Sequence, residues 1–132
     1  MSMKKDRKIA IIGGSTRNSD LSYLSSIHEI WTVNNLYSLC DRLTIPATKS
    51  FELHHITQDT DGTYLRRGCP TMGSTPVIDY LKSLNDLHIP VYMQHKHPLI
   101  RRSISYPFMD IIEKFPRAYF NNSFAYMIAL AI

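Results

Sequence analysis

The chain has 132 residues, of which 44% are hydrophobic and 20% are charged, so it can bury the core of one domain of ordinary size and is not globally disordered. No apolar run approaches the ~18 residues that a membrane span needs, so we expect no contact with the membrane interior. The formal net charge is +4, in small basic groups rather than one tract, so a nucleic-acid partner is not indicated and an anionic small molecule explains the charge equally well.

The first residues, 1–7, are expected to form a flexible tail, and residues 1–132 are expected to form a single domain. The apolar run IAII that follows the tail is too short for the core of a signal peptide, which predicts a cytoplasmic protein. The two cysteines, Cys40 and Cys69, have no metal or redox spacing, so we expect free thiols in preference to a disulfide.

The first half of the chain predicts three strands. Lys8–Gly13 is an apolar run ended by glycine, which is typical of a strand buried on both faces of a parallel sheet. His28–Asn34 and Thr48–His55 are the second and third predicted strands. Between the first two strands, Ser19–Ile27 predicts a short helix that is capped by its first serine or aspartate.

The second half begins with Asp59–Thr75, which lacks a clear period and is expected to be a loop. The segment STPVIDYLKSLNDL predicts an amphipathic helix with Pro76 in its first turn. Ile89–Gln94 is the fourth predicted strand, and the polar segment HKHPLIRRSISYP that follows is expected to be a loop. FMDIIEKF predicts a short helix, and Phe124–Ile132 predicts an apolar helix that runs to the last residue.

Strands that alternate with helices predict an α/β fold, a three-layer sandwich with a mainly parallel sheet of about four or five strands. The last predicted helix has an apolar surface. It either packs as a terminal element or completes a core shared with a second subunit, so a homo-oligomer formed through the C-terminal helix is one expected partner arrangement.

Polar residues follow each predicted strand. In an open α/β sheet, ligands bind beyond the carboxyl ends of the strands. This rule selects four segments as a candidate binding site, namely Gly13–Asn18, Asn34–Tyr37, His54–Thr57 and Gln94–His97.

The glycine turn after the first strand has two interpretations. Backbone N–H groups at Gly13 and Gly14 could approach an anion, and Ser15 and Thr16 could add hydroxyl donors. GGSTRN matches neither the dinucleotide-binding nor the P-loop motif, however, and a tight strand-to-helix turn explains it as well.

Other candidate ligand-binding residues are asparagines, a serine and arginines. Asn34 and Asn35 end a strand and could pair with a base or ribose, or start an Asx-turn. Arg101, like its neighbour Arg102 and the pair Arg66 and Arg67, could hold a phosphate with its planar fork or could be a solvated surface residue. Asn122 and Ser123 precede the last predicted helix, where a hydroxyl either caps the helix or helps to hold an anion.

Three histidines are candidate catalytic acids or bases, or phosphate donors: His54, His55 and His97. His54 and His55 are neighbours on a strand and point to opposite faces, so they are poor co-ligands of a metal. His95 and His97 have no cysteine or obvious carboxylate beside them. We therefore expect no metal site and no resident cofactor.

Three segments, KIAIIGGSTRN, EIWTVNNLY and YFNNSFAYMIALAI, resemble in this order the pattern of bacterial sialyltransferases that use a CMP-sugar donor and of the related pterin-pyrophosphokinase-like proteins. The same pattern occurs in a set of uncharacterised phage proteins, which also share strands similar to Phe51–His54 and Pro90–Gln94. In the transferases the glycine turn carries an asparagine where this chain has Gly14, the pattern continues beyond the last helix, and their catalytic histidine has no match here.

The resemblance implies a Rossmann-like nucleotide site. In it, Gly13, Gly14 and Ser15 lie under the phosphate or ribose, Asn34 hydrogen-bonds the nucleotide, and Ser123 contacts the base or phosphate. It also implies a location in the host cytoplasm if the chain is encoded by a phage.

Three functions remain as alternatives. The expected one is binding of a nucleotide or nucleotide-derived anionic ligand, with sequestration and no turnover. The second is a small glycosyltransferase-like or nucleotide-sugar-processing enzyme in which His54, His55 or His97 acts as acid or base. The third is a non-catalytic, oligomeric interaction domain.

Overall fold

The computed structural model describes residues 7–12, 29–36, 46–116 and 122–132, with the backbone alone at position 124. A five-stranded sheet forms its centre, in the order β1-β2-β3-β8-β9, and every neighbouring pair is parallel. These strands are β1 (Ile9–Ile11), β2 (Glu29–Val33), β3 (Lys49–Glu52), β8 (Val91–Met93) and β9 (Ser103–Ser105). The predicted Rossmann-like α/β fold with a mainly parallel sheet is confirmed.

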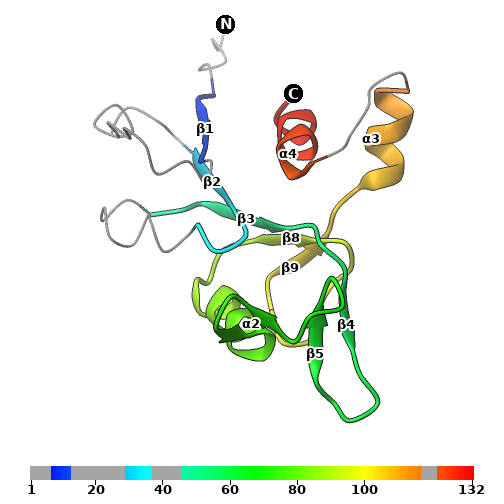
Figure 1. Ribbon diagram of the computed structural model, residues 1–132. Helices are drawn as coiled ribbons and strands as arrows, with labels where there is room; N and C mark the ends of the chain where they lie inside the picture. Colours follow the sequence, from blue (N-terminus) through cyan, green and yellow to red (C-terminus); the bar gives the residue numbers. More distant parts are fainter. Residues whose placement is uncertain (1–6, 13–28, 37–45, 117–121) are drawn as a thin grey trace, which may run out of the picture.

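Helices lie on both sides of the sheet (Figure 1). The helix α2 (Val77–Asp86) and the hairpin of β4 (Ile56–Gln58) and β5 (Tyr64–Arg66) lie on one side. On the other side are α3 (Phe108–Lys114) and α4 (Ser123–Ala131). A short ribbon of β6 (Thr71–Met72) and β7 (Thr75–Pro76) leads into α2. This arrangement gives the three predicted layers.

Two hydrophobic cores separate the layers. Trp31, Val33 and Phe51 belong to the core beneath α3 and α4, together with buried residues of those helices such as Met127. The second core joins α2 to β8, with Leu81 among its fully buried residues. Successive strand residues point to opposite faces of the sheet, so a sheet that is buried on both faces has a separate core on each side.

The connection between β8 and β9 is unusually short. Parallel neighbours normally need a crossover of a dozen or more residues, usually with a helix, whereas residues 94–102 make this connection alone. Ser103 and Ser105 of β9 support it, because their hydroxyl oxygens accept the backbone N–H groups of His97 (2.9 Å) and Lys96 (3.2 Å). Ile100, which is 1% exposed, anchors the connection in the second core.

Most of the expected elements in the described residues are confirmed, with small changes at their ends. Strands occur within all four predicted runs, and helices occur at all three predicted positions after residue 70. The helix predicted at Ser19–Ile27 lies outside the described residues, as does Cys40; Cys69 is an exposed free thiol.

Two predicted loops were wrong. Asp59–Thr75 contains β5, β6 and most of the hairpin turn, in which the Asp59 N–H donates to the Thr63 carbonyl at 2.8 Å. The loop predicted after the fourth strand contains β9. Both were missed because these strands have only two or three residues each and carry serines, threonines or arginine in place of an apolar run.

None of the helices in the described part of the chain has the length and apolar character to cross a bilayer.

The second core gives a direct test of the fold. Leu81→Ala should reduce the free energy of unfolding by about 2–5 kcal/mol, because Leu81 is fully buried and its truncation leaves a cavity. Ile78→Ala, on the same helix but at a position 38% exposed, is the matched control and should cost about 1 kcal/mol or less. Urea titrations followed by circular dichroism measure both, and equal losses would contradict the packing of α2.

Candidate functional site

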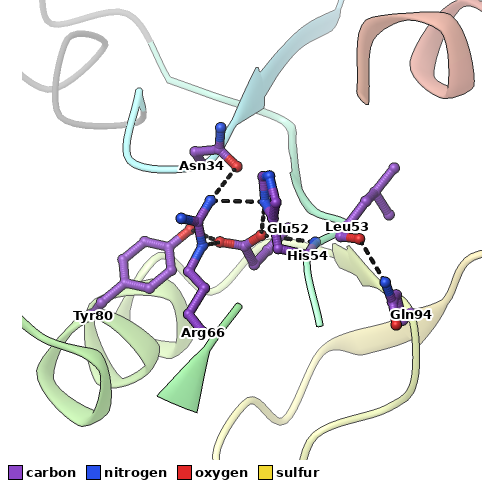
Figure 2. Close-up of polar contacts among 7 residues, drawn as sticks. All are labelled: Asn34, Glu52, Leu53, His54, Arg66, Tyr80 and Gln94. Atoms are coloured by element: carbon purple, nitrogen blue, oxygen red, sulfur yellow. Dashed lines mark hydrogen bonds and ion pairs between the residues drawn. The ribbon is translucent and has the colours of Figure 1, made fainter. Parts of the chain in front are cut away.

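The carboxyl ends of β2, β3 and β8 lie side by side and carry polar residues (Figure 2). Asn34 follows β2, His54 lies two residues after the end of β3, and Gln94 follows β8. Arg66 of β5 and Tyr80 of α2 reach the same place from the neighbouring layer. The site is therefore built by the sheet edge together with the hairpin and α2.

Glu52, the last residue of β3, is the centre of these contacts and is fully buried. Its Oε1 atom accepts hydrogen bonds from Arg66 Nε at 2.5 Å and from the Tyr80 hydroxyl at 2.9 Å. Its Oε2 atom accepts the backbone N–H of His54 at 3.1 Å and lies 2.8 Å from His54 Nδ1. Burial of the carboxyl group favours the neutral form, but the contacts with His54 and Arg66 outweigh it and hold the pKa of Glu52 below its ordinary value.

His54 shares one ring nitrogen between two partners. Nδ1 lies 2.8 Å from Glu52 Oε2 and 2.7 Å from Arg66 Nη2. A carboxylate only accepts and a guanidinium only donates, so a neutral imidazole satisfies one of these contacts at a time. Pairing with Glu52 leaves Nε2 as an acceptor, whereas pairing with Arg66 makes Nε2 a donor.

Asn34 has left-handed backbone geometry, with φ of 56°, which asparagine adopts more readily than most residues. Its N–H donates to the Phe51 carbonyl at 2.9 Å, and its Oδ1 accepts Arg66 Nη2 at 3.1 Å. Its amide nitrogen makes no hydrogen bond to another residue that the structure describes. Asn34 therefore presents a side-chain donor in a fixed position.

A small pocket adjoins this network between the ends of β3 and β8. We call it the histidine pocket; its volume is about 80 Å³ and its lining residues are His54, His55, Ile56, Met93, Gln94, His95, Lys96 and His97. Gln94 holds its two sides together, because Nε2 donates to the Leu53 carbonyl at 2.9 Å and Oε1 lies 3.2 Å from His55 Nδ1.

His97 is more deeply engaged than its neighbours. Its Nδ1 accepts the backbone N–H of Leu99 at 3.2 Å, and its ring packs edge-on against Tyr64, with 5.3 Å between the ring centroids. Burial lowers the pKa of His97, which favours a neutral ring. Because Nδ1 accepts a hydrogen bond, the proton of that neutral ring is on Nε2.

The structure brings some of the predicted site residues together. Asn34 and His54 both contact Arg66, and the exposed Asn35 follows in the same turn. His55 and His97 line the histidine pocket with His54. Gly13, Gly14, Ser15 and Thr16 lie outside the described residues.

Other predicted residues lie elsewhere. Arg101 precedes β9, and its backbone N–H donates to Asn85 Oδ1 in the last turn of α2, at the amino edge of the sheet. Asn122 is the N-cap of α4, where its Oδ1 accepts the Ala125 N–H at 3.0 Å, and Ser123 is the first helical residue. The helix is thus capped by the asparagine, and not by the serine.

Sequence reasoning gave no role to Glu52 or Tyr80, and it named Gln94 and Lys96 only as members of the segment Gln94–His97. It considered Arg66 as a phosphate ligand, and not as the partner of a buried carboxylate. One signal was available: Glu52 interrupts an otherwise apolar strand end, FEL, and a buried carboxylate needs a cationic or donor partner. That partner is Arg66, in the segment that was expected to be a loop.

Among the described residues, no group of three or more His, Cys, Asp or Glu side chains is arranged to hold a metal ion. Comparisons of the chain with protein-family models, curated proteins and solved structures found no match. The site is therefore interpreted from its own chemistry.

The buried carboxylate predicts a specific acid response. Because the pKa of Glu52 is lowered on folding, its contribution to stability is complete above its ordinary value of 4.5 and is lost as the pH falls through the lowered pKa. At pH 7, Glu52→Gln should lower the free energy of unfolding by about 3 kcal/mol, since it leaves Arg66 without its carboxylate.

The difference between wild type and Glu52→Gln should shrink as the pH falls below 4.5, as measured by urea denaturation over a pH series. Glu113→Gln, exposed on α3, is the control and should follow the wild-type curve. A difference that stays constant down to acid pH would contradict the charged state of Glu52.

Proposed function

We propose that the protein binds a nucleotide or a nucleotide-derived anionic small molecule at the carboxyl edge of its sheet, without turnover. The main supporting observation is that Arg66, which is paired with the buried Glu52, contacts both Asn34 and His54 and so fixes the position of Asn34. His54 in turn lines the histidine pocket. Parallel α/β sheets bind ligands at this edge.

Asn34 suits recognition of a base or ribose. Its Oδ1 is engaged with Arg66, which orients the amide and leaves its N–H groups for an acceptor on the ligand, such as a base carbonyl or ring nitrogen. A side chain already fixed before binding loses little conformational freedom in the complex.

The charge around the site suits an anion. Arg66, the exposed Arg67 and the exposed Lys96 lie near the same edge, and the histidines add donors. Glu52 is the carboxylate within this network, and its charge is offset by the ion pair with Arg66. Arg66 and Tyr80 already make hydrogen bonds to Glu52, which supports a binding role for the network in preference to a reactive one.

Ligand screening tests this proposal. In a panel of nucleotides, cyclic nucleotides and ADP-ribose derivatives, at least one compound should raise the melting temperature and be recovered unchanged. At a hundredfold excess over its Kd it should add about 2.7 kcal/mol to the free energy of unfolding. Asn34→Gly, which tolerates the positive φ, should weaken that ligand about tenfold because it removes a hydrogen bond.

Arg101→Gln is the control, because Arg101 lies at the opposite edge of the sheet and the variant should bind as tightly as wild type. Calorimetric titration measures all three proteins. If no compound in the panel shifts the melting temperature, or if Asn34→Gly and wild type bind equally, the proposed function is wrong.

A second candidate function is acid–base catalysis on a nucleotide-sugar. It is favoured by one contact, the 2.8 Å distance between Glu52 Oε2 and His54 Nδ1. A buried carboxylate that accepts the Nδ1 proton fixes the tautomer and leaves Nε2 free to take a proton from an attacking hydroxyl or water. This candidate differs from the first only in whether the ligand is consumed.

Product analysis separates the two functions. If His54 is a base, wild type incubated with nucleotide-sugars should release a nucleotide that chromatography detects, and His54→Gln should retain binding but lose turnover at least a hundredfold. His88→Asn, which replaces a histidine at the opposite edge with a residue that accepts its φ of 53°, should keep wild-type turnover. Quantitative recovery of intact nucleotide-sugar rejects the catalytic candidate.

A further inference from the structure

We infer that the histidine pocket is an oxyanion subsite that receives one phosphoryl group of the ligand. The inference rests on the proposed function, because it assigns the phosphate end of that same ligand, while Asn34 contacts its base or ribose end. Its support comes from the charge, size, rigidity and position of the pocket.

The lining of the pocket has basic and neutral residues only. Lys96 carries a positive charge, and four histidines supply ring nitrogens, whereas none of the eight lining residues has a carboxylate. The nearest carboxylate in the network, Glu52, already accepts hydrogen bonds on both oxygens and is paired with Arg66. An anion in the pocket therefore meets donors and no free negative charge.

Size decides which part of a ligand fits. The pocket volume is about 80 Å³. Sites that enclose a whole drug-sized ligand measure about 300–1,000 Å³. The pocket thus has room for a group of a few atoms, such as a phosphoryl group, and a nucleoside must remain outside it.

The walls of the pocket are held in place before any ligand binds. Gln94 connects the Leu53 carbonyl on the β3 side with the His55 ring through the two ends of its amide. On the β8 side, Ser103 and Ser105 accept the backbone N–H groups of His97 and Lys96. Donors that are already positioned bind an anion with less loss of conformational entropy.

The hydrogen bonds of His97 assign it a donor nitrogen. Its Nδ1 accepts the Leu99 N–H, so the neutral ring carries its proton on Nε2 and can donate it to an oxyanion. His55 Nδ1 lies 3.2 Å from Gln94 Oε1, an acceptor, which assigns a proton to that nitrogen. The pocket therefore combines one neutral N–H donor with the charge of Lys96.

His54 connects the two parts of the site. It contacts the network of Glu52 and Arg66 through Nδ1 and also lines the histidine pocket. Arg66 also holds Asn34, so a chain of contacts through Arg66 and His54 connects the Asn34 amide with the pocket. A ligand with a base or ribose at Asn34 would extend its phosphate across His54 into the pocket.

Phosphate titration tests the subsite with the full chain in a chloride buffer. Inorganic phosphate is the probe, monitored by calorimetry and by 31P line broadening. The double variant His97→Asn, Lys96→Gln should bind phosphate about tenfold more weakly than wild type, because asparagine keeps an acceptor for the Leu99 N–H but lacks the Nε2 donor. Lys96→Gln alone should bind phosphate about two- to fivefold more weakly. Lys82→Gln, which removes the same charge from an exposed position on α2, should bind like wild type.

A second arm compares a nucleoside monophosphate with its nucleoside. In wild type the phosphate should increase affinity, and in the double variant this increase should disappear while nucleoside affinity is unchanged.

If nucleotides and nucleosides bind equally and the variants bind like wild type, the subsite is rejected while the proposed function stands. If no nucleotide binds but phosphate binds with the predicted variant effects, the proposed function fails and the anion site remains. If phosphate binds wild type and the double variant equally, the subsite is rejected.

Discussion

The buried carboxylate of Glu52 is the constraint on which the candidate site and the packing around it depend. Transfer of a carboxylate from water into a protein interior costs several kcal/mol unless charge and hydrogen bonds compensate it. Here the compensation comes from hydrogen bonds donated by Arg66 of β5, by the Tyr80 hydroxyl of α2 and by the backbone N–H of His54. The position of a single side chain at the end of β3 therefore couples the sheet to the hairpin and to α2.

The same contacts create the candidate site. The Arg66 side chain attaches the hairpin to β3 through its ion pair with Glu52, and Ile56 and Tyr64 of the hairpin pack against the second core. Once it is attached, Arg66 also fixes the Asn34 amide and contacts the His54 ring. The same ion pair thus stabilises the fold and positions the candidate site, so a change at Glu52 should affect both, whereas a change at Asn34 should affect mainly the candidate site.

The parts of the fold that sequence could predict are those formed by long apolar or periodic segments. Four strands and three helices of this kind are confirmed, and the carboxyl-edge rule selected Asn34 and His54 before their contact through Arg66 was known. β9 could not be predicted because its sequence, Ser-Ile-Ser, has no apolar run. Its serine hydroxyls accept backbone N–H groups of the preceding loop. The pairing of Glu52 with Arg66 depends on a hairpin whose short strands carry no periodic signal.

The location of the histidine pocket follows from an unusual feature of the topology. In doubly wound sheets the crevice for a ligand forms where the strand order reverses, but the described strands of this sheet follow the order of the chain. The opening lies instead between the adjacent strands β3 and β8, where β3 continues towards the hairpin and β8 enters the short connection to β9. Because residues 94–102 make that crossover without a helix, the polar residues Gln94–His97 remain at the carboxyl edge of the sheet and line the histidine pocket.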